Sequence, residues 1–210
     1  MNGISARRGD KLLFENINIL LDCGDLLWVV GENGIGKTSF LRICANLLRP
    51  DQGDVSWRRE HHPANAAQTI AFQTHKGFAK SSLTASEDLS FWMNMMTKSS
   101  SQHSDLKTYN RELLCALGLE DAIATKTQHL SAGQSRRLAL AKLIAAERPI
   151  WIMDEPLAGL DRSGCDLVSG CVATHIARGG IALIASHNPP IIDAPSARRL
   201  TLGAPVQKAA

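Results

Sequence analysis

Apolar positions divide the chain into short runs typical of strands and longer stretches with helical spacing. Residues 11–21 and 26–30 form the first two runs, and the second is apolar throughout, as in a strand buried on both faces of a sheet. Residues 38–48 then carry apolar side chains at helical spacing, and Pro50 with Gly53 predicts the end of that helix. The chain is therefore predicted to begin with strand, glycine-rich loop and helix.

After a segment in which only helical spacing is found, the rest of the chain again alternates predicted helices and strands. Residues 84–132 have helical spacing with a serine-rich break at 99–104, which predicts a helical subdomain inserted into the core. Next come a helix over 132–147, a strand over 150–153, and a further helix before a strand over 181–185. Helices that alternate with buried strands indicate an α/β fold with a mostly parallel sheet. The tail after residue 196 shows no pattern.

Length and composition are those of one folded domain spanning residues 1–210. Hydrophobic residues make up 44% of the chain and charged residues 20%, which excludes a disordered or fibrous protein. The net charge of +3 is too small to indicate a nucleic-acid surface. Five cysteines form no CxxC pair, so we expect reduced thiols. Because no apolar run reaches spanning length and the N-terminus lacks a signal-peptide pattern, we expect membrane contact only through a partner.

A complete phosphate-binding pattern, G-x-x-x-x-G-K-[ST], lies between the strand at 26–30 and the following helix. It consists of Gly31, Glu32, Asn33, Gly34, Ile35, Gly36, Lys37 and Thr38, and Ser39 follows in the same predicted site. Glycines let consecutive backbone N–H groups curl around a polyphosphate, and the helix start adds a partial positive charge. We expect Lys37 to reach the β- and γ-phosphates and the Thr38 hydroxyl to bind Mg²⁺.

Two adjacent carboxylates end the apolar strand at 150–153. Ligands bind at the carboxyl edge of open parallel sheets, so Asp154 and Glu155 are predicted to lie beside the phosphates. We assign Asp154 to Mg²⁺ and Glu155 to polarising the water that attacks the γ-phosphorus. A solvated strand end is the common alternative for such a pair, but the upstream phosphate loop favours the catalytic interpretation.

A third motif opens the helix that precedes this strand, and it reads Leu130-Ser131-Ala132-Gly133-Gln134. Ser131 is a good helix N-cap, and a hydroxyl with free amides at a helix start can bind an anion. With the phosphate loop, this pentapeptide resembles the signature motif of ATP-binding cassette (ABC) ATPases, although Ala132 stands where that family has glycine. The resemblance covers residues 5–190. It implies a P-loop NTPase fold, an ABC-type nucleotide-binding domain with an added antiparallel β portion, and ATP and Mg²⁺ as ligands.

The resemblance also implies a homodimer in which two chains sandwich two ATP molecules. Each signature motif would close over the nucleotide held by the opposite subunit, through Ser131, Gly133 and Gln134. Asp161 ends the segment Ala158-Gly159-Leu160-Asp161 and would carry communication between the subunits.

Three further residues are assigned to the nucleotide through the family's pattern. His187 follows the strand at its expected place, where the family has a catalytic histidine that contacts the γ-phosphate. Gln73 is the glutamine nearest to the family's Mg²⁺-sensing position, which by spacing falls on His75 and Lys76. Arg8 stands where the family has an aromatic ring that stacks on adenine, and a planar guanidinium can also stack on a base. A simple surface charge is the alternative for Arg8.

Within the ABC ATPases, the chain resembles the ATP-binding subunits of the cytochrome c maturation (haem) exporter, by its compact size and by residues 33–38, 48–57, 130–142 and 158–161. This likeness implies a peripheral protein on the cytoplasmic side of the bacterial cell inner membrane, bound to an integral membrane permease. It implies ATP hydrolysis coupled to haem export or to release of haem from its chaperone, with no nucleic-acid partner. The adjacent His61 and His62 lie on a polar loop, which favours solvated side chains over haem ligands.

Three other functions would use some of the same motifs. The ATPase of another ABC exporter is one alternative, and a cassette ATPase linked to nucleic acid is the second. The second normally has tandem cassettes or a long coiled-coil insertion, and the sequence contains neither. A nucleotide-binding module without hydrolysis would be expected to lose Lys37 or Glu155, and both are present.

Overall fold

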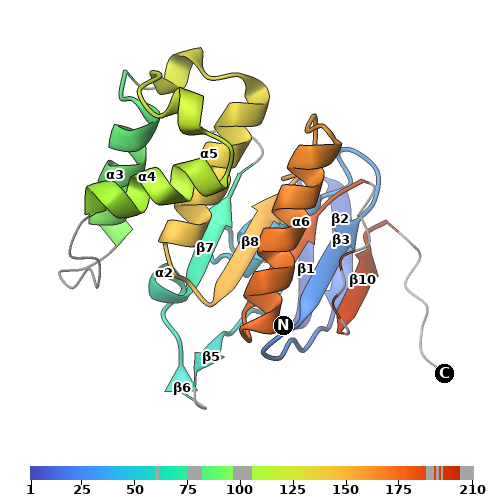
Figure 1. Cartoon of the computed structure of the whole chain (residues 1–210). Coiled ribbons are helices and arrows are strands. Elements are labelled where there is room, and N and C mark those ends of the chain that lie inside the picture. Colours follow the sequence, from blue (N-terminus) through green and yellow to red (C-terminus); the bar gives the residue numbers. More distant parts are fainter. Residues whose placement is uncertain are drawn as a thin grey trace.

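Five parallel strands form the central sheet of the protein (Figure 1). Across the sheet their order is β10 (Ala197–Thr201), β3 (Leu26–Val30), β9 (Ile181–Ala185), β8 (Ile150–Asp154) and β7 (Ile70–Gln73). The computed structural model describes residues 1–59, 62–74, 82–96, 106–187, 192, 194 and 196–203. The strand order and direction confirm the predicted α/β fold with a mostly parallel sheet.

Alternate residues of each central strand enter two hydrophobic clusters, one on each face of the sheet. On β3, Trp28 packs in the cluster with α5 (Ala132–Ala145) and α6 (Arg162–Ala177), whereas its neighbour Val29 packs in the cluster with α1 (Lys37–Cys44). Successive side chains of a strand point to opposite faces, and both faces are covered here. This explains why the strand is apolar at every position.

A second, antiparallel sheet packs on the α1 side of the central sheet. Phe14 of this sheet meets Phe40 of α1 edge to face, with ring centroids 5.6 Å apart. Such pairs add specific geometry to the burial of apolar area. A hairpin and a short helix then lead into β7. The strands of the antiparallel sheet are β2 (Lys11–Ile17), β1 (Asn2–Arg8) and β4 (Gln52–Asp54), and the connecting elements are β5 (Arg58–Arg59), β6 (His62–Pro63) and α2 (Ala66–Thr69).

A helical lobe of α3 (Ala85–Met96), α4 (Leu106–Ala116) and the first turns of α5 stands beside the sheet (Figure 1). The 3-10 turns η1 (Glu120–Ala122) and η2 (Thr127–His129) connect α4 to α5. Burial of Leu89, Met93, Leu114 and Leu117 gives the lobe its own part of the core.

Lys142 of α5 ties the lobe to the rest of the fold. Its buried ammonium group forms an ion pair with Asp88 of α3, and its carbonyl accepts a hydrogen bond of 3.0 Å from the indole nitrogen of Trp92. A buried lysine needs such a partner because the loss of hydration is expensive. The lobe and α5 therefore meet through paired polar groups as well as apolar packing.

Helix α1 ends at Cys44 rather than at the predicted residue 48. Asn46 has a left-handed backbone with φ 58°, and the N–H of Leu47 donates to the carbonyl of Arg42 at 2.8 Å. This is the Schellman pattern, which closes a helix and turns the chain away. Leu47 and Leu48 are exposed, so their apolar character continued the helical pattern past its true end.

Strand β10 was not predicted, because the sequence after residue 196 shows no apolar period. It pairs in parallel with β3 at the edge of the sheet, and most of its side chains are exposed. Strand β2 ends at Ile17, short of the predicted residue 21, next to Asn16 in a left-handed conformation. In both places, backbone pairing rather than side-chain pattern sets the bounds of the strand.

His175 of α6 lies between β8 and a glycine turn. Its ring stacks on Trp151 with centroids 4.0 Å apart and planes 9° apart, and its Nε2 lies 3.3 Å from the carbonyl oxygen of Ile181. A Cβ on Gly180 would lie 2.3 Å from that nitrogen, so the turn accepts only glycine. Loss of hydration on burial lowers the pKa of His175 from its ordinary 6.5. We therefore assign a neutral imidazole that donates to Ile181.

Acidification should destabilise the fold through His175. Because the unfolded imidazole takes up a proton at a higher pH than the folded one, the free energy of unfolding falls as the pH drops below about 6.5. We expect the Tm of the wild type to decrease between about pH 7.5 and about pH 5.5, and His175→Phe to show a smaller decrease. Thermal unfolding followed by circular dichroism measures this. An equal decrease in both proteins would contradict the assignment, and His129→Gln, at an exposed histidine, serves as the control.

Candidate active site

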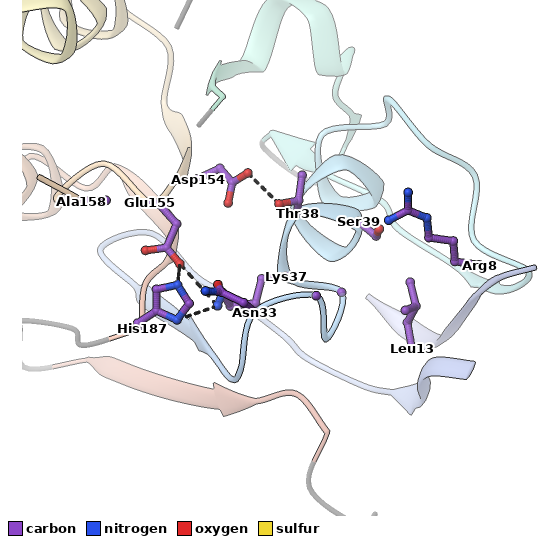
Figure 2. Close-up of a pocket in the computed structure, with 12 residues that line it drawn as sticks. Arg8, Leu13, Asn33, Lys37, Thr38, Ser39, Asp154, Glu155, Ala158 and His187 are labelled. Atoms are coloured by element: carbon purple, nitrogen blue, oxygen red, sulfur yellow. Dashed lines mark hydrogen bonds and ion pairs between the residues drawn. The ribbon is translucent and has the colours of Figure 1, made fainter. Parts of the chain in front are cut away.

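The phosphate loop joins the end of β3 to the start of α1 at the carboxyl edge of the central sheet (Figure 2). Two of its glycines are required by geometry. Gly31 has φ 148°, and a Cβ there would lie 2.9 Å from the carbonyl oxygen of Leu202; Gly36 has φ 119°, and a Cβ there would lie 3.0 Å from Cβ of Leu13. Gly36 is also the N-cap of α1, which carries no acidic residue in its first turn. The positive end of the helix is therefore open to an external anion.

Lys37 occupies the middle of the site with only 6% of the residue exposed. Its Nζ donates to the carbonyl of Gly31 at 2.7 Å, and it lies 3.2 Å from Nδ1 of His187 and 3.4 Å from Oε1 of Glu155. The three side chains come from three different segments, and Figure 2 shows them pointing toward one another. A buried ammonium group is thus held by two carbonyls, the second being that of Glu32 at 3.4 Å, and by one ring nitrogen and one carboxylate.

Thr38 and Asp154 connect α1 to the end of β8. The Thr38 hydroxyl donates to Oδ2 of Asp154 at 2.8 Å, and Asp154 is 4% exposed. Gln73 of the neighbouring strand β7 is in register with Met153, one residue before Asp154, and its buried Oε1 has no hydrogen-bond partner in the described part of the chain. Hydroxyl, carboxylate and amide oxygens are the ligands that Mg²⁺ prefers, so these side chains fit a Mg²⁺ ion.

Glu155 has a left-handed backbone, with φ 51°, directly after β8. Its N–H donates to the carbonyl of Ala185 at 3.0 Å, which fixes a conformation that costs about 1–3 kcal/mol for a residue other than glycine. Oε1 of Glu155 lies 3.1 Å from Nε2 of His187. Because Nδ1 of His187 faces the Lys37 ammonium group, which can only donate, we assign the proton of the neutral ring to Nε2, which donates to Glu155.

These groups open into a cavity of about 310 Å³, in the range of small-molecule sites. Arg8 and Leu13 lie at one end of it and Glu155 and His187 at the other (Figure 2). Arg8 is an exposed residue. The complete lining is Arg8, Leu13, Asn33, Gly34, Gly36, Lys37, Thr38, Ser39, Asp154, Glu155, Ala158 and His187.

Other residues that the sequence assigned to the nucleotide do not line this cavity. A Cβ on Gly31 would lie 3.0 Å from Cγ2 of Ile35, and the carbonyl of Glu32 accepts from Nζ of Lys37 at 3.4 Å. Gln73 is buried on β7, in register with Met153. Positions 75 and 76, the alternatives to Gln73 by spacing, lie outside the described residues, as does His61.

The signature residues form a capping box at the start of α5. Ser131 Oγ accepts from the N–H of Gln134 at 3.1 Å, and Oε1 of Gln134 accepts from the N–H of Ser131 at 2.9 Å. Gly133 leaves its helix face open, since a Cβ there would meet only Leu160, at 4.0 Å. Asp161 caps α6, with Oδ1 accepting from the N–H of Gly164 at 2.9 Å. None of these residues joins the phosphate cavity of its own chain.

Leu13, Ala158 and Leu202 are parts of the site that sequence reasoning missed. Leu13 lines the cavity and packs on Gly36, Ala158 lines it beside Glu155, and the carbonyl of Leu202 packs on Gly31. Only Ala158 had a signal, because it follows the acidic pair by three residues. The contacts of Leu13 and Leu202 depend on pairing of distant strands, which leaves no local pattern.

A family model described as "ABC transporter" matches residues 14–158. The chain therefore belongs to the ABC transporter family of ATPases. A protein of Rhizobium meliloti (strain 1021), the cytochrome c biogenesis ATP-binding export protein CcmA, is 42% identical over 89% of this chain and 89% of its own length. Proteins of the same name from Nitrobacter winogradskyi and Haemophilus influenzae are each 35% identical, over 96% and 89% of this chain and 96% and 87% of their own lengths. Within the ABC family, the chain belongs to this CcmA family.

Solved structures share the fold at lower sequence identity. A dimeric ATP-binding cassette in a post-hydrolysis state bound to ADP and Pi superposes with a TM-score of 0.74 at 21% identity, over 89% of this chain and 86% of that one. An inward-facing metal-chelate-type ABC transporter gives a TM-score of 0.72 at 21% identity, over 90% of this chain and 72% of that one. The fold is that of an ABC nucleotide-binding domain.

Removal of the Lys37 ammonium group should weaken nucleotide binding itself. A charge-assisted hydrogen bond contributes about 2 kcal/mol, so Lys37→Ala should raise the Kd for ATP by roughly 30-fold. Isothermal titration of the full chain with ATP and Mg²⁺ measures this. Lys126→Ala, at an exposed lysine of the helical lobe, is the matched control. An unchanged Kd in Lys37→Ala would show that the phosphate loop is not where the nucleotide binds.

Proposed function

We propose that the protein is the ATP-hydrolysing subunit of an ABC exporter for cytochrome c biogenesis. One observation carries this proposal. The side chains of Lys37, Glu155 and His187 lie within 3.4 Å of one another, beside the open N-terminus of α1. Relatives named for cytochrome c biogenesis, at 35–42% identity, support the transport context.

Hydrolysis follows from the positions of the side chains. Incoming phosphates replace the Gly31 carbonyl as partners of Lys37, and the free amides of the loop and of α1 bind the phosphate oxygens. Glu155 accepts a proton from a water molecule whose oxygen attacks the γ-phosphorus, and the bond from that phosphorus to the bridging oxygen breaks, giving ADP and phosphate. His187 holds Glu155 through Nε2–H, and the His187 ring would lie against the γ-phosphate beside Lys37.

Thr38, Asp154 and Gln73 would hold Mg²⁺, and Arg8 would stack on the adenine at the far end of the cavity. When bound, Mg²⁺ neutralises phosphate charge. The unpartnered Oε1 of Gln73 and the paired oxygens of Thr38 and Asp154 support this assignment. In Figure 2, Arg8 lies at the opposite end of the cavity from Glu155 and His187, which is consistent with a nucleotide that spans the cavity. Arg8 is exposed, so it can reach a base without loss of buried contacts.

The active form would be a homodimer in which Ser131, Gly133 and Gln134 of one chain close over the ATP of the other. The start of α5 offers a hydroxyl and amides outside the cavity of its own chain, which is consistent with a partner's phosphate as the ligand. A solved neighbour is described as a dimer with ADP and Pi. Asp161, at the start of α6, would couple the two nucleotide sites of the dimer.

A membrane permease would receive the motion through the helical lobe. Phe91 is 56% exposed and Met95 is 59% exposed, one turn apart on α3, so they present an apolar edge to a partner. In the described part of the chain, no helix is both long enough and apolar enough to span a bilayer. By its likeness to the cytochrome c biogenesis export proteins, the protein would lie on the cytoplasmic side of the inner membrane as a peripheral subunit, and the complex would use ATP to export haem or to release it from its chaperone.

Loss of the Glu155 carboxylate should stop turnover and leave ATP binding intact. Glu155→Gln keeps the size and backbone of the side chain and removes the base, so kcat should fall by about 10²–10⁴-fold while the Kd for ATP stays within about twofold. Steady-state phosphate release and equilibrium titration measure the two quantities. Glu120→Gln, at an exposed glutamate of the lobe, is the control. Turnover at the wild-type rate in Glu155→Gln would remove Glu155 from its role.

The transport context is tested in a strain that lacks the chromosomal copy. We expect that strain to lack covalently haem-stained c-type cytochromes, and the wild-type chain to restore them. Phe91→Ser/Met95→Ser should bind ATP normally but fail to co-purify with membranes and fail to restore the cytochromes. Leu47→Ser/Leu48→Ser, at exposed leucines after α1, should behave as the wild type. Normal cytochromes in the deletion strain would overturn the assignment to this exporter.

A further inference from the structure

The loop of residues 158–161 runs from the phosphate cavity to the first turns of α5 in the same chain. Ala158 lines the cavity next to Glu155, and its N–H donates to the Glu155 carbonyl at 3.3 Å. The N–H of Leu160 donates to the carbonyl of Leu157 at 3.2 Å, which continues the turn. Asp161 then begins α6 as its N-cap. The loop is therefore held by hydrogen bonds at both ends.

One face of α5 meets this loop through residues at i, i+3 and i+4, the spacing that places side chains on one side of a helix. Gly133 faces Leu160, since a Cβ at 133 would lie 4.0 Å from Cδ2 of Leu160. Arg136 packs on Gly159, which has φ 71°, and its Nη1 lies 3.1 Å from the place that a Cβ on Gly159 would take.

Arg137, the third position of this face, contacts two segments at once. Its Nη2 lies 4.0 Å from Oδ1 of Asp161, and its Nη1 donates to the carbonyl of Gly118, at the end of α4, at 3.2 Å. Gly118 has φ 66°, and a Cβ there would lie 2.7 Å from Nη1 of Arg137. The planar fork of arginine can reach both partners, and a lysine can reach only one at a time.

The energies of these contacts decide what they do. Asp161 is 72% exposed, and an exposed ion pair contributes at most about 1 kcal/mol to stability. A displacement of about 1 Å of a catalytic group, by contrast, can cost about 100-fold in rate. The contacts therefore add little to the stability of the fold, whereas a small shift of the loop that they contact can change the rate strongly.

We propose that Arg136 and Arg137 are positioning residues for ATP hydrolysis, which hold the 158–161 loop against the start of α5. The 158–161 loop begins at the phosphate cavity of its own chain. The start of α5, which carries the two arginines, would bind the nucleotide of the partner chain. The two arginines therefore make the two nucleotide sites of a dimer move together. This inference rests on the proposed function, since it requires two sites and hydrolysis.

The test uses Arg136→Ala and Arg137→Ala in the complex with the membrane subunit. We expect each variant to lower kcat by roughly tenfold and to bring the Hill coefficient for ATP toward one, because the two sites lose their link. The Kd of the full-length isolated chain for ATP should stay within about twofold, because neither arginine lines the cavity. Arg137→Lys should fall between the wild type and Arg137→Ala.

Arg111→Ala, at an exposed arginine of α4, is the matched control and should leave all three quantities unchanged. A lower Tm with wild-type kcat and Hill coefficient in both arginine variants would mean that the contacts only stabilise the fold, and would overturn the inference. An equal loss of ATP affinity in the isolated chain would also overturn it. Failure of the proposed function is a different result, namely wild-type turnover by Glu155→Gln.

Discussion

Parallel pairing of β3, β9 and β8 is the constraint on which the site depends. Val29 pairs with Ala185, and Ala185 pairs with Asp154, so three strands end side by side. Gly31, Glu155 and His187 each follow one of these three paired residues by one or two positions. The ammonium group of Lys37, the carboxylate of Glu155 and the imidazole of His187 meet at one edge because three strands run in the same direction and stop in register.

The same edge explains the electrostatics of the site. Lys37 is a buried cation, and burial of a charge is expensive unless partners replace its hydration. Backbone carbonyls, Glu155 and His187 supply those partners, which keeps the ammonium group at the mouth of the phosphate loop. In the proposed function, an incoming phosphate would exchange one set of partners for another, and the side chain is already oriented before the ligand arrives. The left-handed backbone of Glu155 is a local strain, and the hydrogen bond that its N–H donates to the Ala185 carbonyl of β9 holds it in place.

Two-faced burial connects the site to distant parts of the chain. Residues of β3 alternate between the cluster under α5 and α6 and the cluster under α1. Close packing in both clusters lets a shift of α5 reach the strands whose ends carry the chemistry. Lys142 with Asp88, and Arg137 with Gly118, add polar contacts that join α5 to α3 and to the segment after α4. Helix α5 is therefore the element that joins the lobe, the signature motif and the sheet.

The sequence by itself determined the phosphate loop, the acidic pair, the strands at 26–30 and 150–153 and the class of fold, because these depend on backbone freedom and apolar pattern over a few neighbouring residues. The sequence did not predict β10, because the exposed side chains of that strand show no alternation of apolar and polar positions. It also misplaced the end of α1, where Asn46 rather than Pro50 turns the chain. Tertiary structure alone decided which nitrogen of His187 faces Lys37, why Gly31 must fit under Leu202, and which arginines touch the 158–161 loop. Each of these contacts joins residues far apart in the chain, and only the packing of the strands and helices sets the distance between them.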